Sequence, residues 1–191
     1  MVYAAEQDAL CYPGTTVLIN LAGITDQPTL DEFEFAMYLT RADEPLPHGD
    51  LGYAHYCQIH RHLFQDVYAW AGQPRTIRIA KGGNWFCYPE YLQAEMSRVF
   101  DRGRIAVLTN TSDRPTFCTL AAELLADINA GHPFRDGNGR TQLTFLALLA
   151  ATAGRGFDAG KLEPERVMQA MIDSFAGRLD GLIELIKDLT A

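Results

Sequence analysis

The apolar run TQLTFLALLAATAGR, residues 141–155, restricts the fold more than any other stretch of the chain. It continues a helix that we expect to begin around Asn138 to Arg140, and it is apolar on nearly every side. A helix of that kind must be surrounded by other elements of the fold. A chain of 191 residues, 48% of them hydrophobic, can bury such a helix in one domain. The sequence therefore predicts a compact, mainly α-helical protein with this helix near its centre.

Other segments with helical spacing supply the surrounding helices. Between residues 50 and 70, for example, Tyr53, Tyr56, Ile59 and Leu63 recur at the spacing of one helix face. Polar residues that favour helix starts precede three of the segments. We expect helices over 29–42 capped by Thr29, 50–70 capped by Asp50, 89–103, 113–131 capped by Asp113, 163–176 and 179–189.

Residues 76–88 interrupt the helical pattern. AGQP, residues 71–74, breaks the preceding helix, TIRIA then alternates β-branched and polar residues, and KGGN forms a turn before WFCY. This order predicts a short β-hairpin. A lone hairpin is only marginally stable, so it must lie against the helices. The first part of the chain, residues 11–30, reads as an ordered but irregular lead-in.

Composition excludes several classes of protein. The net charge is −8 and the three lysines are scattered, which disfavours direct binding of nucleic acid. No apolar stretch approaches the length of a membrane span, and MVYAAEQDAL lacks the pattern of a secretory signal, so a cytoplasmic protein is expected. The four cysteines form no CxxC pair and are expected to be reduced, mostly buried thiols. His55, His60 and His62 lack the spacing of a zinc site and are expected to be structural or exposed.

The segment GHPFRDGNGR, residues 131–140, contains several polar and charged residues just before and at the start of the central helix. Gly137 and Gly139 permit close approach of a ligand to the backbone, and the first helical turn presents unpaired N–H groups. Such a helix start favours anions. Arg140 adds a fork suited to phosphate, and Asn138 offers both a donor and an acceptor. The sequence therefore predicts a phosphate-binding site.

Asp136 and His132 indicate which reaction the site could catalyse. A carboxylate beside phosphate repels it unless a cation lies between them, and Mg²⁺ is the simplest such cation. A histidine titrates near neutrality and can accept a hydroxyl proton. Together these groups indicate nucleophilic attack on a phosphate. The alternative is a glycine-rich turn in which the histidine and the aspartate merely cap helices.

The run HPFRDGNGR, residues 132–140, matches the signature HxFx[D/E]GNGR of the Fic family. HRHLFQDVYAWAGQPRT, residues 60–76, resembles the family's entry into its hairpin, called the flap. YPGTTVLINLAGI, residues 12–24, looks similar to bacterial Fic toxins that are inhibited by a separate small protein. The resemblance implies a single Fic domain over 1–191, with a core of about 50–160 and a helical bundle with the flap beside the active-site loop.

Fic proteins are typically protein adenylyltransferases, which transfer AMP from Mg-ATP to a Ser, Thr or Tyr hydroxyl of a target protein and release pyrophosphate. The resemblance implies that His132 is the general base and that Asp136 holds Mg²⁺. The nucleotide-binding residues that it implies are Gly137, Asn138, Gly139 and Arg140, with Lys81 and Gly82 at the turn of the flap as further candidates.

The resemblance also implies partners. The flap of Fic proteins binds the target by strand addition, and bacterial relatives of this group modify DNA gyrase or topoisomerase IV. The family's inhibitory motif [S/T]xxxE[G/N] is absent, and TRADEP, residues 40–45, comes nearest, so a small inhibitory antitoxin in trans is expected.

One residue departs from the fuller family pattern GNGRxxR, because Leu143 stands at the second arginine. In relatives that arginine orients the γ-phosphate of ATP. Transfer of UMP, phosphocholine or phosphate therefore stays open, as does a degenerate Fic domain that only binds or regulates.

Overall fold

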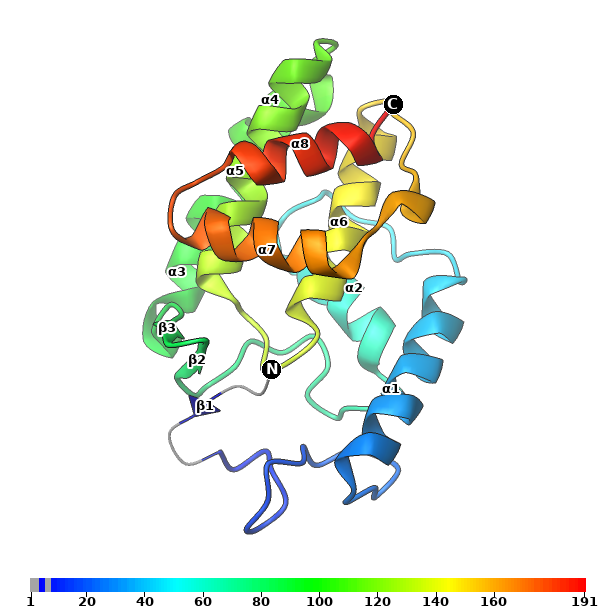
Figure 1. Ribbon diagram of the computed structural model, residues 1–191, viewed down its shortest axis with the longest axis vertical. Helices are drawn as coiled ribbons and strands as arrows, with labels where there is room; N and C mark the ends of the chain where they lie inside the picture. The colour runs from blue at the N-terminus through cyan, green and yellow to red at the C-terminus, as the bar shows by residue number, and fades with distance from the viewer. Residues whose placement is uncertain (1–3, 6–7) are drawn as a thin grey trace.

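The computed structural model describes residues 4–5 and 8–191. In this part of the chain eight α-helices dominate, and the sheet is small and lies to one side (Figure 1). The predicted mainly α-helical fold is confirmed. The helices are α1 (Gln27–Ala42), α2 (Tyr53–Phe64), α3 (Pro89–Val99), α4 (Arg102–Asn110), α5 (Arg114–Gly131), α6 (Asn138–Thr152), α7 (Pro164–Phe175) and α8 (Asp180–Leu189).

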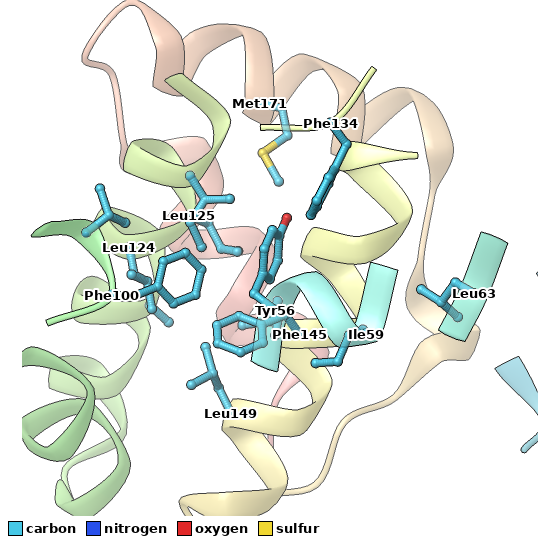
Figure 2. Close-up of a cluster of buried hydrophobic side chains, with 14 of the residues drawn as sticks. Tyr56, Ile59, Leu63, Phe100, Leu124, Leu125, Phe134, Phe145, Leu149 and Met171 are labelled. Atoms are coloured by element: carbon cyan, nitrogen blue, oxygen red, sulfur yellow. The ribbon is translucent and has the colours of Figure 1, made fainter. Parts of the chain in front are cut away.

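The helix α6 lies at the centre of the bundle, as its apolar sequence predicts. None of its residues from 141 to 150 is exposed. Helices α2, α4 and α5 pack against it. The aromatic rings of Tyr56, Phe100, Phe134 and Phe145 gather in the core beside α2 and α6 (Figure 2). Tyr56 of α2 packs its ring 5.3 Å from that of Phe145 and 5.6 Å from that of Phe134. This core fixes the loop between α5 and α6, which carries the predicted site.

Two predicted helix caps are wrong. The N-cap of α1 is Asp26, whose carboxylate accepts the Thr29 N–H at 3.1 Å, so Thr29 lies inside the first turn. Pro28 fits that first turn because a proline lacks the N–H that would be unpaired there. The N-cap of α2 is Gly52, and Asp50 accepts the Gly52 N–H at 3.0 Å from outside the helix. Asp113 is the N-cap of α5, as predicted.

Two predicted helices are also too long. The segment 50–70 is helical only to Phe64, and residues 65–70 continue as turns. The segment 89–103 ends at Val99, and the further helix α4 begins after Asp101, whose side chain accepts the N–H groups of residues 103 and 104. Gly103, the last residue of the predicted range, therefore lies in the first turn of α4. Both C-terminal helices lie close to their predicted ranges.

The predicted hairpin is present and shorter than expected. β2 (Ile79–Lys81) and β3 (Asn84–Trp85) are antiparallel and joined by the Gly82–Gly83 turn. A strand that the sequence did not predict, β1 (Ala4–Ala5), pairs antiparallel with the other side of β2, with Ala4 opposite Ala80. Among the described residues, β2 is therefore the central strand of a three-stranded sheet.

The four cysteines are free thiols, and only Cys118 is fully buried, whereas the other three are half-buried. Within the described residues, no helix combines the length and the apolar character that crossing a membrane requires.

Candidate active site

The predicted site lies in the loop between α5 and α6, and both ends of this loop have special backbone conformations. His132 ends α5 in the left-handed region, with φ of 48°, and its N–H donates to Ile128 O at 2.8 Å. Gly137, with φ of 76°, precedes the first residue of α6, and its N–H donates to the carboxylate of Asp136 at 2.6 Å. The chain therefore turns sharply twice within six residues.

Both the neighbouring side chains and the backbone conformation require a glycine at position 137. A Cβ built at this position would lie 2.5 Å from a ring carbon of Phe64 and 3.0 Å from Nε2 of His60. Real side chains do not approach so closely, and the positive φ further disfavours a residue with a Cβ. The glycine predicted from the sequence to admit a ligand therefore also lets the loop pack on α2.

His60 of α2 contacts the loop through a hydrogen bond and a stacked ring. The Gly72 N–H donates to its Nδ1 at 2.8 Å, so Nδ1 is unprotonated, and Nε2 donates to Asp136 O at 3.0 Å. Its ring stacks on Phe134 at 3.8 Å between centroids. Burial lowers the pKa of His60 to about 3, so the ring stays neutral. The prediction of a structural role for His60 is confirmed.

His55 and His62 also make local hydrogen bonds. His55 accepts the Leu51 N–H at 3.1 Å, and His62 Nε2 lies 2.9 Å from Arg41 O.

Asn138 closes the loop with both atoms of its amide. Its Oδ1 accepts the Phe134 N–H at 3.0 Å, and its Nδ2 donates to Phe134 O at 2.8 Å. The side chain is 1% exposed. It therefore shapes the loop, and a contact between Asn138 and a bound anion would come from its backbone.

The imidazole of His132 is buried, and its surroundings define its tautomer. Its ring stacks on Phe86, with 3.8 Å between centroids and 11° between planes. Its Nδ1 lies 3.3 Å from Asn129 O, and because a carbonyl only accepts, Nδ1 carries the proton and Nε2 keeps its lone pair. Burial lowers the pKa of His132 to about 3. The ring is thus neutral at neutral pH.

A pocket of about 440 Å³ opens beside His132. Its polar part includes Lys81 of β2 and Gly139 and Arg140 of α6. The rest is mostly apolar and comes largely from α7 and the segment before it. The apolar lining includes Leu143, Leu162, Val167, Met168, Met171 and Ile172. Two cationic side chains and a mostly apolar lining suit a ligand that carries both phosphates and an apolar, planar group.

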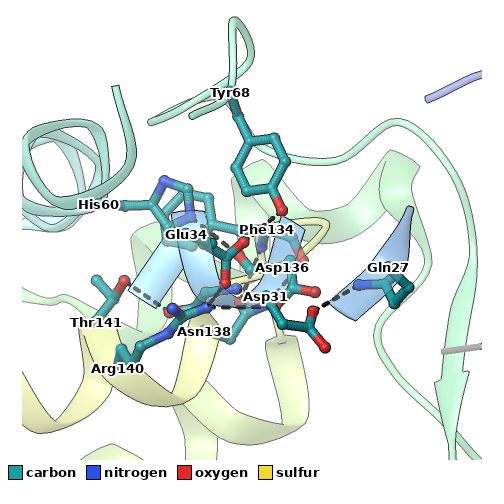
Figure 3. A network of polar contacts seen from close by, with 11 residues as sticks. Gln27, Asp31, Glu34, His60, Tyr68, Phe134, Asp136, Asn138, Arg140 and Thr141 are labelled. Carbon is teal, nitrogen blue, oxygen red and sulfur yellow. Dashed lines mark hydrogen bonds and ion pairs between the residues drawn. The ribbon is translucent and has the colours of Figure 1, made fainter. Parts of the chain in front are cut away.

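A polar network lies next to this pocket (Figure 3). The guanidinium of Arg140 donates to the carboxylate of Glu34 on α1, and the Tyr68 hydroxyl donates to the other oxygen of that carboxylate. Nη2 of Arg140 lies 3.9 Å from Asp136 Oδ1. No local pattern in the sequence identifies Glu34 or Tyr68 as part of this site, since both lie far along the chain from the loop.

The flap is tied to the loop by Arg75, which is 4% exposed. Its guanidinium donates to the carbonyls of Ile77 and Cys87 at the two ends of the flap, and to those of Gly131 and His132 at the end of α5. The flap and the loop with His132 are therefore held by one side chain, which sequence analysis did not identify.

The structure brings some of the predicted site residues to the pocket and leaves others outside it. His132, Lys81, Gly139 and Arg140 line the pocket. Asp136, Gly137 and Asn138 shape the loop beside it. Gly82 lies in the flap turn and is not among the lining residues. No group of three or more His, Cys, Asp or Glu side chains gathers into a metal site within the described residues. Asp136 is the carboxylate of the loop itself, and Mg²⁺ shared with phosphates generally needs few protein ligands.

Comparison with known proteins identifies relatives along the whole chain. The chain is 54% identical over 188 residues to a protein of Sinorhizobium fredii named probable protein adenylyltransferase y4lH, and the match covers 97% of both chains. It is 32% identical to the protein adenylyltransferase VbhT of Bartonella schoenbuchensis, where it covers 97% of this chain and 39% of VbhT.

Solved structures show the same fold. BepC of Bartonella tribocorum, with bound AMPPNP, superimposes with a TM-score of 0.85 at 26% identity, over 95% of this chain and 96% of that one. The N-terminal Fic domain of a Bep effector of Bartonella quintana, with bound ADP, gives a TM-score of 0.86 at 27% identity, over 95% and 94%. Residues 50–150 match the family model described as Fic/DOC family. The chain belongs to the Fic/DOC family.

Proposed function

We propose that this protein is a protein adenylyltransferase, which transfers AMP from Mg-ATP to a Ser, Thr or Tyr hydroxyl of a target protein. The observation that carries the proposal is the neutral His132, which lines the same pocket as Lys81 and Arg140. The names of the relatives and the nucleotides bound in two similar structures support it. We also propose that residues 1–191 form one Fic domain.

In this reaction the target hydroxyl attacks the α-phosphorus, and the bond to the β-phosphate oxygen breaks. The hydroxyl proton goes to Nε2 of His132, and pyrophosphate leaves with the electron pair of the broken bond. Arg140 and Lys81 balance the charge of the phosphates, and backbone N–H groups at the start of α6 add to this. Asp136 would hold Mg²⁺, which would neutralise charge shared by two phosphates.

The target would bind at the flap by strand addition. β2 already pairs on both sides, with β1 and with β3. A target strand therefore requires either the outer edge of β3, where Trp85 is exposed, or the departure of Ala4–Ala5 from β2. DNA gyrase and topoisomerase IV are the targets to test first, and a separate small antitoxin is the inhibitor to look for beside this protein.

Leu143 supports a second candidate, transfer of another phosphate-containing group. It lines the pocket next to Arg140 and offers the donor an apolar surface. UMP, phosphocholine or phosphate transfer would each be compatible with a donor that makes no charged contact there.

Labelling of a bacterial lysate tests both candidates. Label from α-labelled ATP should appear on a protein band with the wild type, vanish with His132→Ala and persist with His48→Ala, a control at an exposed histidine. Label from γ-labelled ATP or α-labelled UTP would favour the second candidate. Equal labelling by His132→Ala would contradict the base assignment.

A further inference from the structure

Glu34 is a charged residue next to the pocket to which the proposed reaction assigns no role. It lies on α1, outside the residues 50–150 that match the family model. Its side chain is 13% exposed, and each carboxylate oxygen has a partner, Arg140 on one side and Tyr68 on the other. A half-buried carboxylate held at both oxygens has a fixed position, so it can fix the position of what it binds.

Arg140 is held on more than one side. Its guanidinium carbon lies 4.6 Å from the ring centroid of Phe64 and 5.4 Å from that of Tyr38. Glu34 binds at Nη2, and the side chain still lines the pocket. A long arginine side chain loses considerable rotamer freedom when it is ordered. The rings and Glu34 therefore impose this ordering before a ligand arrives, which lowers the cost of binding.

Asp136 explains why the contact with Glu34 matters. Its Oδ1 lies 3.9 Å from Nη2 of Arg140, farther than a hydrogen bond. Without Glu34, Asp136 would be the one carboxylate of the described residues left within reach of the guanidinium. The guanidinium would then move onto Asp136. Arg140 would then leave the phosphates, and the carboxylate that is proposed for Mg²⁺ would be neutralised.

We propose that Glu34 is a positioning residue for nucleotide binding, which holds Arg140 toward the phosphates and away from Asp136, with Tyr68 as its support. This inference rests on the proposed function, because it assumes that the pocket binds Mg-ATP. It extends the site to α1 and to the turn that follows α2.

The test compares Glu34→Gln and Tyr68→Phe with the wild type and with Asp31→Asn. Asp31 lies on the same helix and accepts a hydrogen bond from Gln27 at 2.6 Å, so its variant controls for loss of a carboxylate on α1 (Figure 3). Mg-ATP affinity is measured by calorimetry, and labelling kinetics with its Mg²⁺ dependence by transfer from α-labelled ATP.

Glu34→Gln should weaken Mg-ATP binding about tenfold, raise the Mg²⁺ concentration that half-maximal transfer requires, and change kcat much less than KM. Tyr68→Phe, which keeps the carboxylate, should give a smaller effect in the same direction, and Asp31→Asn none. Unchanged Mg-ATP affinity in Glu34→Gln would mean that the contact between Glu34 and Arg140 is only a structural ion pair, and it would overturn the proposal. A rise in activity would make it inhibitory, which would also overturn the proposal. Failure of the wild type to bind Mg-ATP would instead overturn the proposed function.

Discussion

Arg75 offers the sharpest test of how the site is held together. Its five N–H donors lie in a fixed fork, and four carbonyl oxygens from two separate segments accept from them. The substitution Arg75→Lys keeps the positive charge and most of the buried stem. A lysine ammonium is a single point at the end of that stem, so it cannot reach carbonyls on both sides of the fork. We expect about two of the four carbonyls to lose their partner.

The expected magnitude follows from that count. Each buried carbonyl left without a donor costs about 1–3 kcal/mol, so two of them reduce the free energy of unfolding by about 2–6 kcal/mol. Domains of this size are stable by about 5–15 kcal/mol, and the variant should therefore fold at low temperature. Because the lost bonds join the flap to the end of α5, the flap should open more easily than the rest of the bundle.

Urea denaturation followed by circular dichroism measures the change in free energy, and hydrogen exchange compares residues 76–88 with α7 and α8. Arg98→Lys is the matched control, because Arg98 is 65% exposed and pairs with Glu95 at the surface, where such changes have little effect. A loss below about 1 kcal/mol, with exchange in the flap unchanged, would refute the view that Arg75 joins the flap to the loop.

Three further predictions concern the loop and the pocket beside it. His60 and His132 have folded pKa values of about 3 against about 6.5 when unfolded, so only the unfolded chain takes up these protons below pH 6.5. The free energy of unfolding should fall by about 2 kcal/mol per histidine between pH 6.5 and 5, and equal urea midpoints at pH 7.5 and 5 would contradict this. Gly137→Ala should destabilise the fold by about 2 kcal/mol or more, since its Cβ meets Phe64 and its φ is positive. A loss of about 1 kcal/mol lowers the melting temperature of a domain of this size by roughly 2 °C, so a smaller decrease than that would contradict the prediction. Leu143→Arg should raise kcat/KM for ATP by adding a cation to the pocket lining, and steady-state kinetics without any gain would mean that the apolar surface suits the true donor.

The parts of the fold that the sequence predicted depend on neighbouring residues. The burial of α6 follows from side chains within one helix, and the order of His132, Asp136 and Arg140 places them in one loop. The hairpin follows in the same way from its glycine turn. The matches to Fic relatives confirm the family that the signature indicated.

The parts that the sequence did not predict depend on distant residues. Arg140 meets Glu34 across 106 positions, His60 meets Asp136 across 76, and Arg75 meets His132 across 57. No local pattern encodes which of many charged side chains will be brought together by packing. The wrong N-cap at Thr29 has a local cause instead. Asp26 lies three residues earlier and is also a favoured N-cap residue, and its side chain caps the helix.

The hydrogen bonds of His60 and His132 have a spectroscopic consequence. His60 carries its proton on Nε2 and His132 on Nδ1, each fixed by a backbone carbonyl. In a protein labelled with ¹⁵N-histidine the two rings should therefore give opposite tautomer patterns. The His60 ring would report whether the loop is intact, and the His132 ring would report the arrival of a proton at Nε2.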